Sequence, residues 1–168
     1  MKAAVVGSNG VEVRDVEQPK PGPAQVLVRV RAAGLNRADL IMASGRMHGP
    51  TGGAGTVLGL ECAGEVVAFG TEVTGLKAGD RVLCSAAGCY AEYAVADFGR
   101  VHKIPANNMT YPQAATLPPV GEYIPERAFV TIGLSPRLHP RDDSVRPRLP
   151  QAACGLLAAW YACIVLML

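Results

Sequence analysis

The sequence predicts a mainly β protein, a small β barrel with a few short helices. Its 168 residues include 19 glycines and 13 prolines, and 49% are apolar while 18% are charged. This composition is typical of a compact, turn-rich domain. Up to residue 120, short alternating or apolar runs are separated by turn residues, and 16 of the 19 glycines lie there. Many short strands with few helices favour a barrel.

The chain opens with a predicted β-hairpin. Residues 2–6 and 11–16 flank the dipeptide Asn9-Gly10. Asn-Gly is a strong hairpin signal because both residues tolerate the positive φ of a tight turn. After a proline-rich break, 25–33 alternates as a strand, with its three valines on one face.

A short helix is expected over 37–43, with Asn36 as its N-cap and Leu40 and Ile41 on its buried face. A flexible, glycine-rich loop is expected over 45–55.

Further strands complete the predicted barrel. They are expected at 62–69, 81–85, 90–95 and 101–104. A helical turn over 111–116 then ends before Pro118 and Pro119, which cannot continue a helix.

Charge and cysteine content exclude several function classes. The formal net charge is only +2, too small to indicate a nucleic-acid partner. The five cysteines are an odd number without CxxC spacing, and the N-terminus does not resemble a signal peptide. We therefore expect a cytoplasmic, reducing location.

The composition changes near residue 120, which predicts a domain over 1–120 and a divergent segment over 121–168. The second segment has no lysine, five arginines and five prolines, so we expect it to be irregular. Residues 151–168 are uncharged and 16 of the 18 are apolar, which predicts a terminal hydrophobic helix. Two interpretations stay open: a membrane tail anchor, or a helix that docks or aggregates.

Three sequence blocks resemble one protein family. They are PKPGPAQVLVRVRAAGLNRADL at 19–40, LGLECAGEVVAFG at 58–70 and GLKAGDRV at 75–82. In this order they resemble the N-terminal catalytic domain of the medium-chain dehydrogenase/reductase superfamily, and most of all its zinc-independent quinone oxidoreductases of the p53-inducible type. The resemblance covers about 120 residues and implies a GroES-like β barrel. It also implies an NADPH-dependent reduction of a small-molecule quinone or enone.

The resemblance argues against zinc. A catalytic zinc needs three protein ligands from cysteine, histidine or carboxylates. Asn36 and Arg37 stand where zinc-dependent relatives carry Cys and His, and Leu60 replaces the histidine of their Gly-His-Glu block. We interpret Cys62 and Cys84, like Cys89, as small buried apolar residues.

The resemblance also suggests site residues. Asn36 is the catalytic candidate, near the nicotinamide and the substrate, although N-capping is an equal alternative. Met47 and Leu60 are expected at the substrate site, and Met47 replaces a tyrosine that relatives often carry.

Arg37, Asp39 and Glu61 are expected behind this site, in mainly structural roles. Asp39 suits the first turn of a helix because of the helix dipole. Glu61 either orients an active-site group or pairs with an arginine such as Arg37.

No glycine-rich dinucleotide-binding motif follows residue 120. The expected Rossmann domain is therefore missing, and NADPH binding by this chain is doubtful. Two function classes remain: the catalytic domain of a quinone oxidoreductase, inactive alone, or a non-catalytic binding module. We expect the second to pair with itself or with a full-length relative. A ring-forming co-chaperonin shares the barrel, but these blocks do not support it.

Overall fold

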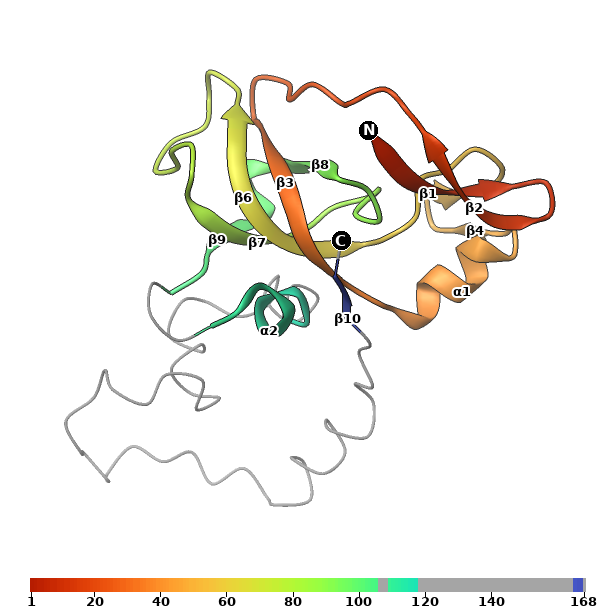
Figure 1. Ribbon diagram of the computed structural model, residues 1–168. Helices are drawn as coiled ribbons and strands as arrows, with labels where there is room; N and C mark the ends of the chain where they lie inside the picture. Colours follow the sequence, from red (N-terminus) through yellow and green to blue (C-terminus); the bar gives the residue numbers. More distant parts are fainter. Residues whose placement is uncertain (106–108, 118–164, 168) are drawn as a thin grey trace, which may run out of the picture.

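The computed structural model describes residues 1–105, 109–117 and 165–167. These residues form a mainly β structure with a few short helices (Figure 1), which confirms the predicted class. The strands are β1 (Lys2–Gly7), β2 (Gly10–Asp15), β3 (Gln25–Gly34), β4 (Met47–His48), β5 (Thr51–Gly52), β6 (Glu61–Phe69), β7 (Arg81–Ser85), β8 (Tyr93–Asp97), β9 (Val101–Lys103) and β10 (Val165–Met167). The helices are α1 (Arg37–Ala43), the 3-10 helix η1 (Phe98–Arg100) and α2 (Tyr111–Ala115).

Strands β1 and β2 form the predicted antiparallel hairpin. Gly10 has a φ of 112° in the turn, a conformation that favours glycine. All of β2 is exposed, whereas β1 is attached to the rest of the molecule by isolated bridges from Ala3 to Ala91 and from Val5 to Val57. Tyr90 also belongs to this junction, because its backbone N–H donates to the carbonyl of Leu58. The predicted strand at 90–95 therefore begins three residues later.

The main sheet follows the order β10-β3-β6-β7-β9, and β8 also pairs with β3. Strands β8 and β9 follow one another through η1 but do not pair with each other. Among the described strands, the sheet is therefore open, and the closed barrel that we expected is not found.

Both faces of the central strands are buried. The valines of β3 face one core cluster as predicted, together with residues of β6 and β7. A β-bulge between Val30 and Ala32 then turns Ala32 to the other face. There Ala32 and Ala63 pack beneath Ala114 and Ala115 of α2. Methyl side chains on both sides let this short helix approach the sheet closely.

A polar cluster fastens α2 to the same face. The Tyr111 hydroxyl donates to Glu65 Oε1 at 3.0 Å, and Arg31 Nη2 donates to Glu65 Oε2 at 3.1 Å. The Arg81 guanidinium lies 4.6 Å from the centre of the Tyr111 ring and donates to the carbonyl of Met109 at 2.6 Å. The pKa of Glu65 is lowered, chiefly by the hydrogen bond from Arg31. We infer that these contacts fix the helix over the sheet.

Helix α1 has the predicted bounds but buries a different face. Asp39 and Met42 are buried, whereas Leu40 is 71% exposed. The prediction that Leu40 lies inside is therefore wrong. Asp39 decides the rotation of the helix, because its carboxylate is hydrogen-bonded in the interior, and Met42 lies on the same side three residues later.

The expected loop at 45–55 contains a small hairpin, in which β4 pairs with β5. The predicted domain segment 121–168 lies almost entirely outside the described residues. Only 165–167 of its expected helix are described, and they form a strand that pairs with Ala32, Ala33 and Gly34. Neither described α-helix has the length and apolar character needed to cross a membrane.

Candidate functional site

The candidate site lies where β3 ends, α1 begins and β6 begins. Asn36 directly precedes α1, and its side-chain Nδ2 donates to Glu61 Oε1 at 2.8 Å. Glu61 is the first residue of β6 and is fully buried. Because a carboxylate accepts hydrogen bonds, the NH₂ group of Asn36 faces Glu61 and its carbonyl oxygen faces elsewhere. The structure thus brings together two residues that lie 25 positions apart.

The buried Glu61 carboxyl is incompletely satisfied. Its Oε2 atom has no hydrogen-bond partner among the described residues. The pKa of Glu61 is raised to about 7, mainly by burial and also by the nearby Asp39 charge, while the hydrogen bond from Asn36 acts in the opposite direction. Burial away from water disfavours the charged form of a carboxyl group. Glu61 can therefore gain or lose a proton near neutral pH.

Gly34, the last residue of β3, leaves room for this carboxyl group. A Cβ atom at Gly34 would lie 2.3 Å from Glu61 Oε1 and 2.7 Å from the carbonyl oxygen of Ala115. Both separations are far below van der Waals contact. Only glycine therefore lets the strand pass beside Glu61 without displacing it.

A second buried carboxyl group, that of Asp39, lies beside the first. Asp39 Oδ2 accepts the backbone N–H of Asn36 at 2.7 Å and the Tyr90 hydroxyl at 2.6 Å. The Tyr90 oxygen is also 3.0 Å from the carbonyl oxygen of Gly34. Burial raises the pKa of Tyr90, and the hydrogen bond to Asp39 raises it as well. Tyr90 therefore stays a neutral donor that ties α1 to the end of β3.

The structure places the predicted site residues in three different environments. Asn36, Asp39 and Glu61 form one connected cluster. Arg37 is exposed, and Glu61 accepts from Asn36 rather than from Arg37, so the ion pair that we considered is not formed. Met47 lies on β4 and is 58% exposed.

Leu60 packs against the main core and is half-buried. Its backbone carbonyl accepts the N–H of Ala86 at 3.0 Å. Its location next to Glu61 in the chain keeps it near the cluster.

Sequence reasoning missed Tyr90 and Gly34. A tyrosine in a buried strand needs a partner for its hydroxyl, and this was the one signal available for Tyr90. Gly34 gave no signal, because its role depends on a carboxyl group far away in the sequence.

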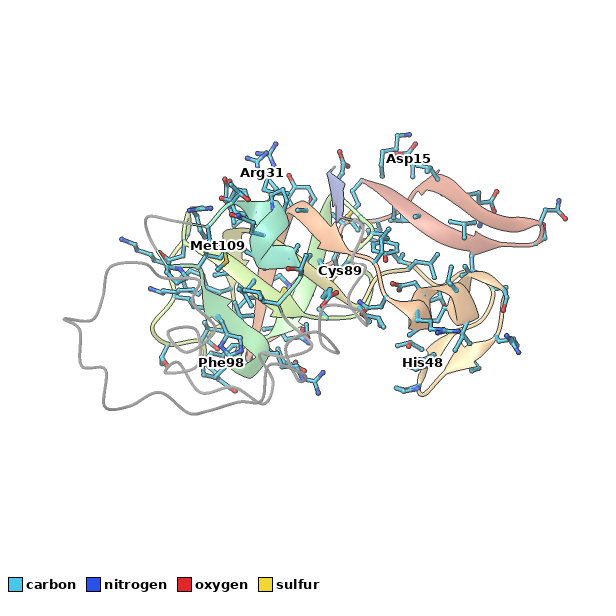
Figure 2. All side chains as sticks on the ribbon, turned by 90° about the horizontal axis from the view of Figure 1, so that it is seen from below. Asp15, Arg31, His48, Cys89, Phe98 and Met109 are labelled. Atoms are coloured by element: carbon cyan, nitrogen blue, oxygen red, sulfur yellow. The ribbon has the colours of Figure 1, made fainter. Side chains whose placement is uncertain are left out.

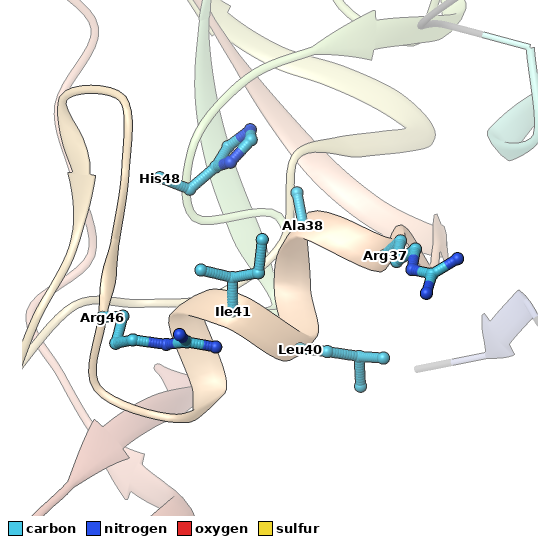
Figure 3. Close-up of a pocket in the computed structure, with 6 residues that line it drawn as sticks. All are labelled: Arg37, Ala38, Leu40, Ile41, Arg46 and His48. Carbon is cyan, nitrogen blue, oxygen red and sulfur yellow. The ribbon is translucent and has the colours of Figure 1, made fainter.

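A shallow pocket of about 380 Å³ lies on the outer side of α1. Figure 3 shows its lining residues, which come from α1, from the residue before β4 and from β4 itself. They are Arg37, Ala38, Leu40, Ile41, Arg46 and His48. Arg37 and Ala38 of this lining directly follow Asn36, whereas Asn36 and Glu61 are not part of it.

The three described cysteines are free and buried, as predicted. Cys62 and Cys84 are cross-strand neighbours with their sulfur atoms 3.5 Å apart. Cys89 Sγ lies 3.1 Å from the carbonyl oxygen of Ala86. The pKa of each thiol is raised, with burial among the causes. These thiols therefore remain protonated and contribute to the core (Figure 2 labels Cys89).

Comparison with known proteins supports the predicted resemblance. The alcohol dehydrogenase GroES-like domain family matches residues 22–106, half of the chain. The chain is 40% identical over 117 residues to a quinone oxidoreductase of Pseudomonas aeruginosa, which covers 68% of this chain and 35% of the relative. It is 43% identical over 88 residues to the acryloyl-coenzyme A reductase of Metallosphaera sedula, covering 49% of this chain and 25% of the relative.

A solved structure gives the same result. The quinone oxidoreductase of Pseudomonas syringae pv. tomato aligns with a TM-score of 0.63 and 33% sequence identity, covering 83% of this chain and 43% of that one. The relatives found by sequence are longer proteins, and the chain spans about a third or less of the length of those that it matches. Its relatives and structural neighbours include quinone oxidoreductases of the medium-chain dehydrogenase/reductase superfamily, and the chain belongs to the family of alcohol dehydrogenase GroES-like domains.

Proposed function

We propose that the chain is the catalytic portion of a zinc-independent, NAD(P)H-dependent quinone oxidoreductase, with enone reduction as the alternative chemistry. The observation that carries this proposal is the Asn36 amide held by the buried Glu61 at the junction of β3, α1 and β6. The names of the relatives from Pseudomonas aeruginosa and Metallosphaera sedula support the two substrate classes, a quinone and an unsaturated carbonyl compound.

We assign the catalytic domain to residues 1–120 and a separate segment to 121–168. The packing of α2 on the sheet supports a boundary after this helix, because its alanines complete the second core cluster. We place the protein in the cytoplasm. We propose that it associates with further copies of itself or with a full-length relative.

Asn36 is the residue that we assign to substrate and cofactor. Its side chain is half-buried, and one end of the amide is fixed by Glu61. The carbonyl oxygen takes part in the capping box at the start of α1, and the second N–H can donate to a substrate carbonyl or to an oxygen of the cofactor. A donor placed in advance stabilises the negative charge that develops on that oxygen during reduction.

Glu61 and Asp39 act as positioning residues. Glu61 fixes the amide plane of Asn36, and Asp39 fixes its backbone N–H. Two anchors on one residue remove most of its conformational freedom before substrate arrives. Met47 and Leu60 border the substrate, and Arg37 lies behind the cluster at the start of α1.

The donor set does not suit a catalytic zinc ion. An amide, a guanidinium and an aliphatic side chain at Asn36, Arg37 and Leu60 are not zinc ligands of the usual kinds. The described residues contain no group of three or more histidine, cysteine or acidic side chains arranged to hold a metal ion. The described thiols are protonated core residues, and zinc binds the thiolate.

The described residues fit one end of a nicotinamide cofactor. The second N–H of the Asn36 amide suits an oxygen of the carboxamide or ribose, whereas the described sheets are antiparallel and offer no glycine-rich turn between a parallel strand and a helix. When bound, the cofactor would supply the hydride. The pyrophosphate therefore needs a partner outside the described residues. We expect the chain alone to be inactive because no glycine-rich dinucleotide-binding motif follows residue 120 in the sequence.

Binding and turnover test this proposal separately. The full chain is titrated with tetramethylbenzoquinone, whose substituted ring resists thiol addition, and binding is followed by NMR; NADPH oxidation is followed by absorbance. We expect saturable quinone binding without turnover. Binding should weaken about tenfold in Asn36→Ala, the effect of losing one hydrogen bond from a desolvated site. Gln18→Ala, which removes an exposed amide, is the matched control.

Each result decides between the two function classes. Quinone binding that depends on Asn36 supports the catalytic assignment. Absence of quinone binding, or equal binding by Asn36→Ala, would contradict it and favour the non-catalytic binding module. NADPH turnover by the chain alone would overturn the expectation that it needs a separate cofactor-binding domain.

A further inference from the structure

We propose that the outer edge of β2 pairs with the same edge of a second copy of this chain, so that the two hairpins form one continuous antiparallel sheet. The proposal rests on the proposed function, in which the chain associates with copies of itself, and it names the surface and the register of that association. Three observations carry it: the unpaired backbone of β2, its exposed valines and the order of its charges.

One edge of β2 has no strand beside it in the described part of the chain. There β2 pairs only with β1, and all six of its residues are exposed. The hairpin lies at one end of the described structure, and its tip projects away from the main sheet (Figure 1 and Figure 2). Unpaired N–H and C=O groups along such an edge are a template for another strand.

The register of the hairpin shows which residues direct their backbone groups outward. Ala4 lies opposite Val13, yet its N–H donates to the carbonyl of Tyr90 at 2.8 Å. The backbone groups of Ala4 and Val13 therefore face away from each other, as in the pairs of an antiparallel ladder that share no hydrogen bond. Because these pairs alternate along the ladder, Val11, Val13 and Asp15 direct their N–H and C=O groups toward the open edge.

An apolar strip lies uncovered beside this edge. Val11 is 50% exposed and Val13 is 73% exposed, and both lie on the same face of the strand. Opposite them on β1 lie Val6, which is buried, and Ala4, which is half-buried. A second hairpin against the edge would set its Val13 beside this Val13 and remove part of both side chains from water.

The order of charges selects one register. Two identical antiparallel strands are related by a two-fold axis, which passes through the residue that pairs with its own copy. With the axis at Val13, Glu12 of each subunit lies opposite Arg14 of the partner subunit. An axis at Glu12, Arg14 or Asp15 would set like charges against each other, and an axis at Val11 would run into the turn. Opposite charges directly across a ladder stabilise it, whereas like charges destabilise it.

Glu12 and Arg14 are oriented for these contacts between subunits. Arg14 Nη2 donates to Glu12 Oε1 within the strand, so the two side chains lie along one face. Both are about half exposed. In the paired sheet, each ion pair would meet the same pair in reverse order, which gives four charges of alternating sign. Asp15 is already paired with Lys2 of its own chain and adds no unpaired charge to the contact.

The contact is small for a protein interface. It involves mainly one short strand from each subunit, whereas stable interfaces bury about 1,200–2,000 Å² in total. We therefore expect a weak dimer that forms at high protein concentration and dissociates on dilution. Sedimentation velocity of the full chain over a concentration series measures this equilibrium.

Two charge-reversal variants test the register. Glu12→Arg leaves two positive residues on β2, and Arg14→Glu leaves two negative ones. Association of each variant alone should weaken about tenfold, because like charges then face each other twice. An equimolar mixture of the two variants should regain the lost affinity, since every positive residue then faces a negative one. Glu72→Arg and Lys20→Glu, which reverse exposed charges outside β2, are the matched controls and should change nothing.

A disulfide cross-link localises the contact. In the paired sheet the two copies of Val13 form a hydrogen-bonded pair, whose Cα atoms lie about 5.5 Å apart. This separation suits a disulfide, so Val13→Cys should form a covalent dimer when oxidised glutathione is added. Val67→Cys, at an exposed valine of β6, is the matched control and should cross-link far less. Both variants carry Cys154→Ser and Cys163→Ser, so that the remaining native thiols are buried.

If the charge variants do not fold, Val13→Pro tests the same contact. The N–H that proline lacks is one that faces the open edge, so the hairpin keeps its hydrogen bonds to β1 while the second copy loses one. We expect a monomer with an unchanged circular dichroism spectrum.

Four results would overturn the proposal. A chain that stays monomeric at every concentration would exclude both this surface and the association with copies. Association that survives in Val13→Pro and in both charge variants would place the contact elsewhere. A mixture that associates no more tightly than its components would exclude the register, and equal cross-linking of Val67→Cys would show random collision. None of these results bears on quinone binding at Asn36, so the catalytic assignment can fail or stand independently.

Discussion

Glu61 and Glu65 lie on the same strand, β6, yet their environments are opposite. Glu65 is partly exposed and has both oxygen atoms bonded, to Arg31 and Tyr111, and its pKa is lowered. Glu61 is fully buried, accepts one hydrogen bond from Asn36, and has its pKa raised to about 7. The chemistry of the two side chains is identical, so the difference comes entirely from what packs around each.

This comparison separates a structural carboxylate from a functional candidate. Glu65 connects α2 to the sheet, and its charged carboxylate is stable because both oxygen atoms accept hydrogen bonds. Glu61 has an unpartnered oxygen in the interior, which costs stability. Such a cost, at a group that titrates near neutral pH and holds an amide in place, is typical of functional sites.

The largest expected effect concerns the pH dependence of stability. The Glu61 carboxyl titrates near 4.5 when unfolded and near 7 when folded. Between these values the folded state keeps a proton that the unfolded state has lost. The free energy of unfolding should therefore fall by about 3 kcal/mol as the pH rises through this range.

Urea unfolding at several pH values measures this fall. It should be absent in Glu61→Gln and retained in Glu72→Gln, which removes an exposed carboxylate. If the free energy of unfolding of Glu61→Gln falls by the same amount, other groups cause the effect, and Glu61 and Glu65 do not differ as described.

The next effect concerns Gly34, which separates the strand from Glu61. Gly34→Ala should cost about 2–3 kcal/mol, because the added methyl group overlaps Glu61 Oε1 and the Ala115 carbonyl oxygen. Gly99→Ala is the matched control, since a Cβ atom there meets nothing within 4 Å. Thermal unfolding compares the two, and equal melting temperatures would mean that Glu61 moves aside freely.

Tyr90→Phe should have a smaller effect. It removes the hydroxyl that bonds Asp39, leaving a buried carboxylate with one partner fewer. We expect a loss of about 1–2 kcal/mol in the free energy of unfolding. Tyr93→Phe, a half-buried tyrosine of β8, should lose less than half as much, and similar losses would show that the Tyr90 hydroxyl is unimportant.

The smallest effect is expected at Glu65. Glu65→Gln weakens a partly exposed ion pair with Arg31 and should cost only about 0.5 kcal/mol, because solvent screens such pairs. Unfolding in low and high salt measures the loss, which should shrink as salt rises. A loss larger than that of Tyr90→Phe would mean that the α2 attachment, rather than the Glu61 cluster, is the critical part of the structure.

Local elements were more predictable than their orientation. The bounds of α1 at 37–43 and the turn at Gly10 follow from capping and turn chemistry, which depend on neighbours in the chain. The buried face of α1 did not follow, because two adjacent apolar residues, Leu40 and Ile41, suggested the wrong side. Asp39 determines that face through a hydrogen bond to Tyr90, a residue 51 positions away.

The sequence by itself determined the mainly β class, most of the strand segments, the resemblance to the GroES-like domain family and three members of the cluster around Glu61. Only the tertiary structure decided that Asn36 donates a hydrogen bond to Glu61, that Gly34 makes room for this contact, and that β8 and β9 do not pair to close the sheet. The physical reason is distance along the chain. Propensity and patterning act over a few residues, whereas the pKa of Glu61 and the hydrogen bond between Asp39 and Tyr90 depend on what folding brings together.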